Sequence, residues 1–201
     1  MNGSIELIPV RGIGEIAPGD DIADVLATAL DKSEIALKDQ DVVVVTHKIV
    51  SKAEGKLVAV ADEHSYRTLV ENEADAILRR RGDLVITRTK HGFICANAGI
   101  DRSNVTESMA TLLPDRPDRS AHSLRMALQH WSKKRLAVVV TDTFGRPWRR
   151  GLTDVAIGIS GIPALIDLRG TSDMYGRSLE VTEIALVDEI ASAADLVMGK
   201  A

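Results

Sequence analysis

The stretch DVVVVT (residues 41–46) contains four consecutive valines, and LAVVVT (residues 136–141) repeats the pattern later in the chain. Valine is β-branched and favours strands. A short continuous apolar run of this kind is typical of a strand that is buried on both faces of a sheet. Each run ends in a threonine, and polar residues follow it. The two segments therefore predict the centre of the fold. They also indicate where polar residues follow buried strands.

Around these two runs, the spacing of apolar residues predicts an alternation of helices and strands. The alternation alone is compatible with a parallel α/β sheet, whereas His91 and Gly92 lie between two strand-like runs and predict an antiparallel hairpin. The helices are expected from Asp20 or Asp21 to Leu30, over the apolar positions of 66–78, around 124–131, and from about 182 to 198 with Gly199 as the C-cap. The further strands are expected at residues 5–10, 57–60, 84–89, 93–96, 155–159 and 164–168.

The composition excludes several classes of protein. Of the 201 residues, 45% are apolar and 27% charged, as in an ordinary globular protein, and the net charge of −4 disfavours binding to nucleic-acid phosphates or anionic membranes. The sequence has no apolar run long enough to cross a membrane and no secretory signal at its first residues. A single cysteine, Cys95, excludes an internal disulfide, so we expect a cytoplasmic protein. We expect one domain over residues 1–201, with a weak internal boundary near residue 82.

Several familiar site motifs are absent from the sequence. It has no GxxxxGK[ST] loop, no HExxH and no CxxC, and its five histidines show no metal-ligand spacing. Residues 12–17 (GIGEIA) match a dinucleotide fingerprint, but Pro18 and Gly19 follow where the helix should begin, which favours a glycine-dependent turn. Cys95 lies in a predicted strand and is more consistent with the core than with a nucleophile.

Three polar segments follow predicted strands, and loops at strand ends are common places for ligand sites. Residues 45–55 carry hydroxyl groups and two lysines, residues 96–104 carry amides, a carboxylate and a hydroxyl group, and residues 140–151 carry Asp142, two threonines and three arginines. Taken singly, these features are also explained by a turn, a turn cap, and a solvated face or subunit contact. Together they provide oxygen ligands for Mg²⁺ or Mn²⁺ and cations for a nucleoside triphosphate. The residues alone therefore predict a metal-dependent enzyme that handles phosphate.

These segments together resemble the coenzyme F-420-0:L-glutamate ligase family, the gamma-glutamyl ligases of the deazaflavin cofactor F-420. The resemblance extends in order over nearly the whole chain, so the combination is far more specific than any single motif. The matching stretches are IVSKAEGK (49–56), ANAGIDRSN (96–104), VVTDTFGRPWRRGLTDVAIGISG (139–161), DMYGRSLEVT (173–182) and DEIASAADLVMGK (188–200).

The resemblance implies a GTP-dependent ligase of F-420 biosynthesis, which adds L-glutamate to the side chain of F-420-0 through gamma-linked amide bonds. The implied route passes through an acyl phosphate that the amine of L-glutamate attacks. Such enzymes use Mn²⁺ or Mg²⁺, with two divalent ions expected, and K⁺ can assist. Two alternatives stay open: the ligase domain of a longer bifunctional F-420 biosynthesis protein, and a non-catalytic module that binds a nucleotide or cofactor.

Carried over by position, the resemblance also implies roles for individual residues. Asp101 and Asp142 correspond to metal-binding aspartates, and Thr143 to a further metal contact, which makes these three the expected catalytic set. The positions that correspond to GTP contacts are Ile13, Gly14, Glu15, Ile16, His47, Lys48, Lys52 and Asn104. Arg146, Arg149 and Arg150 lie in a family motif and are assigned either to substrate phosphate or to a dimer contact.

The fold that the resemblance implies is α+β. Mixed, mostly antiparallel sheets are flanked by helices in two intertwined subdomains, and the protein is expected to be a homodimer. Members usually continue beyond the segment that ends in MGK, so this chain is expected to lack the C-terminal segment of the family.

Overall fold

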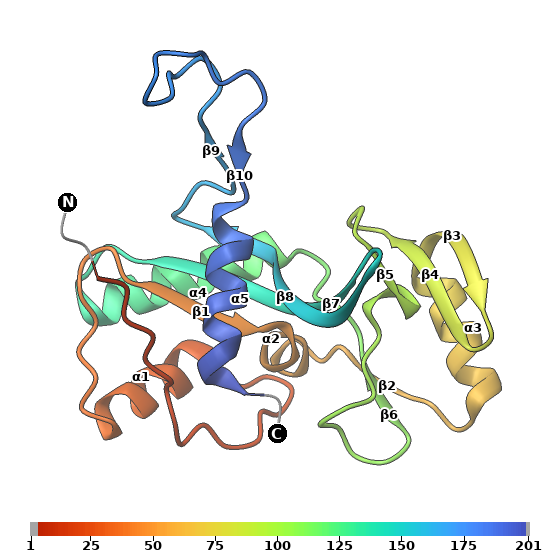
Figure 1. Cartoon of the computed structure of the whole chain (residues 1–201). Helices are drawn as coiled ribbons and strands as arrows, with labels where there is room; N and C mark the ends of the chain where they lie inside the picture. The colour runs from red at the N-terminus through yellow and green to blue at the C-terminus, as the bar shows by residue number, and fades with distance from the viewer. Residues whose placement is uncertain (1–3, 200–201) are drawn as a thin grey trace.

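The computed structural model describes residues 4–199, which fold into helices packed around several small sheets (Figure 1). An aspartate begins α1 as expected, because the side chain of Asp21 accepts hydrogen bonds from the backbone N–H groups of Ala23 and Asp24. The helices are α1 (Ile22–Lys32), α2 (His47–Ala53), α3 (Glu63–Glu73), α4 (Pro117–Ser132) and α5 (Leu186–Met198), with a short 3-10 helix, η1 (Asn97–Gly99).

The two valine runs form the centre of a three-stranded mixed sheet. In it, β1 (Val42–Thr46) is parallel to β7 (Ala137–Arg146), and β7 is antiparallel to β8 (Arg149–Ser160). The other sheets are antiparallel: β3 (Ala74–Arg81), β4 (Leu84–Thr89) and β5 (Ile94–Ala96) in one, β2 (Leu57–Ala59) with β6 (Met109–Thr111), and β9 (Ile166–Asp167) with β10 (Glu183–Ile184). The α+β class with mostly antiparallel sheets is confirmed, and the intertwining of two subdomains stays a prediction.

The main hydrophobic core lies between this sheet and α4. Val138 and Val140 are fully buried on one face of β7, where they pack with Leu124 and Leu128 of α4. Helix α5 crosses in front of the sheet in Figure 1, and α4 lies behind it. Both helices also satisfy the backbone of β8, which is an edge strand: Asp118 of α4 accepts from the N–H of Ile159, and Asp188 of α5 accepts from the N–H of Ala156.

A second core lies beneath the hairpin sheet. Tyr66 and Val70 of α3 are buried against Val85 of β4, Ile100 and Ala110. The expected boundary near residue 82 falls at the turn between β3 and β4, strands that pair in one sheet.

One predicted element is wrong and three others differ in length. Residues 4–10 form no strand, and Ile5 is 91% exposed, because no described strand lies alongside to pair with this segment. The predicted helix over 66–78 ends at Glu73, and the next eight residues form β3 because they pair with β4. The strand expected at 164–168 is reduced to β9, and α5 begins at Leu186 after β10.

The segment between β9 and β10 extends away from the rest of the chain in Figure 1. Its apolar side chains Met174, Tyr175 and Val181 are each more than four-fifths exposed. Among the helices of residues 4–199, none is long and apolar enough to span a membrane.

The contact of β8 with α4 can be tested at Gly158. A Cβ atom at this position would lie 2.5 Å from the backbone carbon of Pro117, the first residue of α4. We expect Gly158→Ala to lower the free energy of unfolding by about 1–3 kcal/mol, because neither backbone segment can move freely. Urea denaturation measures the change, with Gly145→Ala in β7 as the control because no atom lies within 4 Å of its Cβ position. Equal stabilities of the two variants would contradict the packing.

Candidate active site

The register of β1 against β7 places His47 beside Asp142. Thr46 of β1 pairs with Thr141 of β7; the next residues are His47, which begins α2, and Asp142 of β7. The Nε2 atom of His47 lies 3.3 Å from Oδ1 of Asp142 but forms no hydrogen bond, and its Nδ1 atom lies 3.3 Å from the hydroxyl oxygen of Ser51. His47 is only 1% exposed. Its ring therefore supports Asp142 from inside the protein, and its Nε2 atom is left without a hydrogen-bond partner.

Lys48, the next residue of α2, reaches the segment after η1. Its Nζ atom lies 2.8 Å from Oδ2 of Asp101 and donates to the hydroxyl group of Ser103 at 2.5 Å. Burial alone would raise the pKa of the Asp101 carboxyl, but hydrogen bonds from Lys48 and from the backbone N–H of Ser103 outweigh it and lower this pKa below its usual value. Asp101 is therefore ionised at neutral pH.

Lys52 joins two further segments to α2. This lysine is 6% exposed, and its Nζ atom lies 2.5 Å from Oε1 of Glu15 and donates to the backbone oxygen of Asn104 at 2.8 Å. A buried ammonium group is stable only when it has such partners. The N-terminal loop and the loop that contains Asp101 are thus held against the same helix.

The remaining N-terminal residues have different surroundings. Ile16 is buried, and Ile13 packs against the main core. Gly14 borders open space. The side chain of Glu15 contacts α2 through Lys52.

Asp154 is a site residue that the sequence analysis did not identify. Its carboxylate accepts hydrogen bonds from Thr143 Oγ1 at 2.6 Å and from Thr141 Oγ1 at 3.1 Å. Asp154 pairs directly with Thr143 across the β7–β8 ladder and is 2% exposed. The sequence does contain an indication of this residue, because an aspartate stands within the apolar pattern of β8. A buried carboxylate needs hydrogen-bond donors around it.

The three arginines lie elsewhere, at the tip of the β7–β8 hairpin. Arg146 donates to the backbone oxygens of Arg150 at 2.5 Å and Gly151 at 3.4 Å, which stiffens the turn. Arg149 and Arg150 are exposed, and so is Trp148 between them and Arg146. These two hydrogen bonds of Arg146 stabilise the hairpin turn, and neither involves Asp101 or Asp142.

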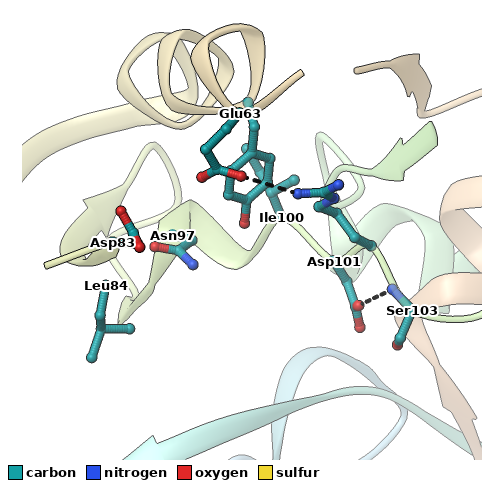
Figure 2. Close-up of a pocket in the computed structure, with 9 residues that line it drawn as sticks. Glu63, Asp83, Leu84, Asn97, Ile100, Asp101 and Ser103 are labelled. Carbon is teal, nitrogen blue, oxygen red and sulfur yellow. Dashed lines mark hydrogen bonds and ion pairs between the residues drawn. The ribbon is translucent and has the colours of Figure 1, made fainter. Parts of the chain in front are cut away.

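An open pocket of about 480 Å³ adjoins Asp101. Figure 2 shows Glu63 of α3 above it, Asp83 and Asn97 to the left, and Asp101 with Ser103 to the right. The candidate site therefore continues into a hollow between α3, η1 and the loop that follows η1.

Three candidate metal ligands, Asp101, Asp142 and Thr143, offer oxygen atoms, which Mg²⁺ and Mn²⁺ prefer. Asp142 and Asp101 lie against His47 and Lys48 of α2, and Thr143 follows Asp142 in β7. Within residues 4–199 no three histidine, cysteine or acidic side chains gather closely enough to enclose an ion by themselves. Mg²⁺ is commonly held in this way, by one or two carboxylates together with substrate phosphates and water.

Sequence comparison assigns the chain to a family. The pattern of the F420-0:Gamma-glutamyl ligase family matches residues 12–68 and 63–201. The chain belongs to this family. Among its relatives, the coenzyme F420:L-glutamate ligase of Methanothermobacter thermautotrophicus is 43% identical over 98% of this chain and 84% of its own length. Those of Methanopyrus kandleri and Archaeoglobus fulgidus are 41% and 38% identical over 98% of the chain, which corresponds to 82% and 83% of their own lengths.

In this gamma-glutamyl ligase, Cys95 of β5 is buried, as expected from the sequence. Burial raises the pKa of the Cys95 thiol to about 11, and the charge of Asp142 adds to the effect. Only about one thiol in a thousand is then ionised at pH 8. We expect iodoacetamide to leave Cys95 unmodified in the folded protein and to alkylate it readily in urea, as measured by intact-mass spectrometry. Rapid alkylation of the folded chain at pH 8 would contradict this.

Proposed function

We propose that this chain acts as a coenzyme F420:L-glutamate ligase that uses GTP to join L-glutamate to F-420-0. Membership of the ligase family supports the reaction. The observation that carries the proposal is the convergence on α2: His47, Lys48 and Lys52 contact Asp142, Asp101 and the backbone of Asn104, which come from two distant segments. Carboxylates and ammonium groups are brought together there, as phosphoryl transfer requires.

The reaction needs two bond-forming steps. A carboxylate oxygen of F-420-0 attacks the γ-phosphorus of GTP, and GDP leaves, so that an acyl phosphate forms. The amine of L-glutamate then attacks the acyl carbon, inorganic phosphate leaves, and the nitrogen loses a proton. The first step is needed because a carboxylate has no good leaving group, and both steps depend on close alignment of the reactants.

We assign the metal ligands to Asp101, Asp142 and Thr143. They would hold Mg²⁺ or Mn²⁺, with two ions expected and K⁺ as an accessory ion. When bound, these ions neutralise phosphate charge. Asp154 holds the Thr143 hydroxyl group in place, and the His47 ring lies 3.3 Å from Asp142.

We assign GTP to the surface formed by Lys48, Lys52, Asn104 and the loop of residues 13–16. The two ammonium groups would attract the phosphates, as lysine does in many nucleotide sites. His47 is assigned to the same site, where its buried ring lies beside Asp142.

Two assignments concern the whole protein. Arg146, Arg149 and Arg150 bind either a substrate phosphate or a second copy of the chain in a homodimer. We also place the enzyme in the cytoplasm, where its three small-molecule substrates would meet.

The direct test is a mass-spectrometric assay of the purified chain with F-420-0, L-glutamate, GTP and Mn²⁺. We expect a GTP-dependent gain of glutamyl units, and a chain extended by any native C-terminal residues serves as a second sample. GTP binding without a glutamyl product in either sample would favour the non-catalytic module instead.

Asp142→Asn tests the metal assignment. We expect kcat to fall by at least about 100-fold, because the amide is a much weaker ligand for a hard cation. The melting temperature should stay close to that of the native chain, and Asp75→Asn, at an exposed ion pair with Arg88, is the control. Near-normal turnover of the Asp142 variant would remove this residue from the metal site.

Arg149→Ala separates the two roles of the arginines. A role in substrate binding predicts a several-fold higher KM for F-420-0 with an unchanged oligomeric state. A dimer role predicts an unchanged KM and a smaller particle in sedimentation analysis. If neither quantity changes, both roles are excluded for Arg149.

A further inference from the structure

The pocket beside Asp101 shares Asp101 and Ser103 with the contacts of α2 and adds polar groups of its own. Glu63 and Tyr66 of α3 line one side, Asp83 and Asn97 another, and Arg102 stands next to Asp101. Apolar atoms of Leu84 and Ile100 complete the lining. A hollow with a few convergent polar groups next to a candidate reaction centre is a suitable place for a substrate.

The charges of this pocket discriminate between the substrates. Three carboxylates line it, those of Glu63, Asp83 and Asp101, and Arg102 is the cation among the lining residues. Outside the lining, Arg67 has a nitrogen 2.5 Å from Asp83 and another 3.9 Å from Glu63, and the Nζ atom of Lys48 lies 2.8 Å from Asp101. The three carboxylates are thus balanced by three cations, and a triphosphate or a phosphodiester would gain no net attraction here. A ligand that carries both an ammonium group and carboxylates would find partners of both signs.

We propose that this pocket receives the acceptor L-glutamate. The inference rests on the proposed function, because L-glutamate is the one substrate of that reaction with a positive charge. Arg102 binds a carboxylate of the amino acid, and the amine faces Asp101, next to which the acyl phosphate forms. The ammonium group loses one proton before its nitrogen attacks the acyl carbon and a second as the amide forms, and both pass to water at the open side of the pocket.

The guanidinium group of Arg102 is positioned to bind a carboxylate of the ligand. Its guanidinium group lies 5.1 Å from the centre of the Tyr66 ring and 3.4 Å from Oε2 of Glu63, which is a long ion pair on a half-exposed side chain. A substrate carboxylate can replace this weak partner and form the two parallel hydrogen bonds that arginine favours.

The Tyr66 hydroxyl group extends the same subsite. Desolvation raises the pKa of Tyr66, although a hydrogen bond with Asn97 opposes the shift, so the hydroxyl group is protonated at neutral pH. Asn97 is itself fixed, because its Oδ1 atom accepts from the backbone N–H of Val85. A protonated hydroxyl group at the pocket wall can donate to a carboxylate of the ligand.

The test compares Arg102→Ala and Arg102→Lys with Arg80→Ala. Arg80 is a matched control, because both arginine side chains are 48% exposed and each is paired with a glutamate. We expect Arg102→Ala to raise the KM for L-glutamate at least tenfold and to leave the KM for GTP and for F-420-0 within twofold. Arg102→Lys should be intermediate, since it keeps the charge without the planar fork, and Arg80→Ala should behave like the native chain.

Two further measurements keep the inference falsifiable. Tyr66→Phe retains the packing ring and should raise the KM for L-glutamate several-fold. Saturation-transfer NMR of L-glutamate, with GDP and Mg²⁺ present, reports binding without turnover and should show a loss of signal in Arg102→Ala.

The outcomes separate the inference from the proposed function. If Arg102→Ala binds L-glutamate as the native chain does and keeps its KM, the pocket assignment is overturned while the ligase function stands. If the native chain forms no glutamyl product, the ligase function fails, and an unchanged NMR signal in Arg102→Ala would overturn the pocket assignment as well.

Discussion

The parallel pairing of β1 with β7 is the constraint on which the candidate site depends. It joins two segments that are far apart in the chain, and fully buried valines of β7 hold it in place. Val138, Val139 and Val140 are all fully buried, so both faces of β7 are covered, and a shift of one residue would move every side chain to the opposite face. The same shift would move Asp142 away from His47. The register of the two strands therefore determines the position of the polar residues that follow Thr46 and Thr141.

Helix α2 connects the end of β1 to the rest of the site. His47 and Ser51 are four residues apart and share the buried face of the helix, whereas Lys48 and Lys52 share the neighbouring face. Both lysines contact the loop of residues 101–104, one through Asp101 and Ser103 and the other through the backbone of Asn104. A seven-residue helix thus orders the segment that leads into the pocket of Arg102.

The elements that the sequence predicted well are those with a strong local signal. The valine strands, the hairpin of β4 and β5, and α1 with its aspartate cap are of this kind. Strand β3 was missed because its apolar residues also fit a helical spacing, and pairing with β4 decided the outcome. Asp154 and the Arg102 pocket were missed for a related reason: each depends on side chains that only the tertiary fold brings together.

The charges around α2 explain how Asp101 stays ionised at a partly buried site. Asp101 has a lowered pKa because Lys48 and Ser103 donate to it, so a divalent ion need not displace a proton there. An ion bound at Asp101, as proposed above, would instead compete with the ammonium group of Lys48 for the same carboxylate. A doubly charged ion is favoured in this competition, since attraction grows with charge at equal distance. Displacement would leave the Lys48 ammonium group without its carboxylate, and a phosphate group is a suitable new partner for it. Metal and nucleotide would then support each other's binding through one lysine.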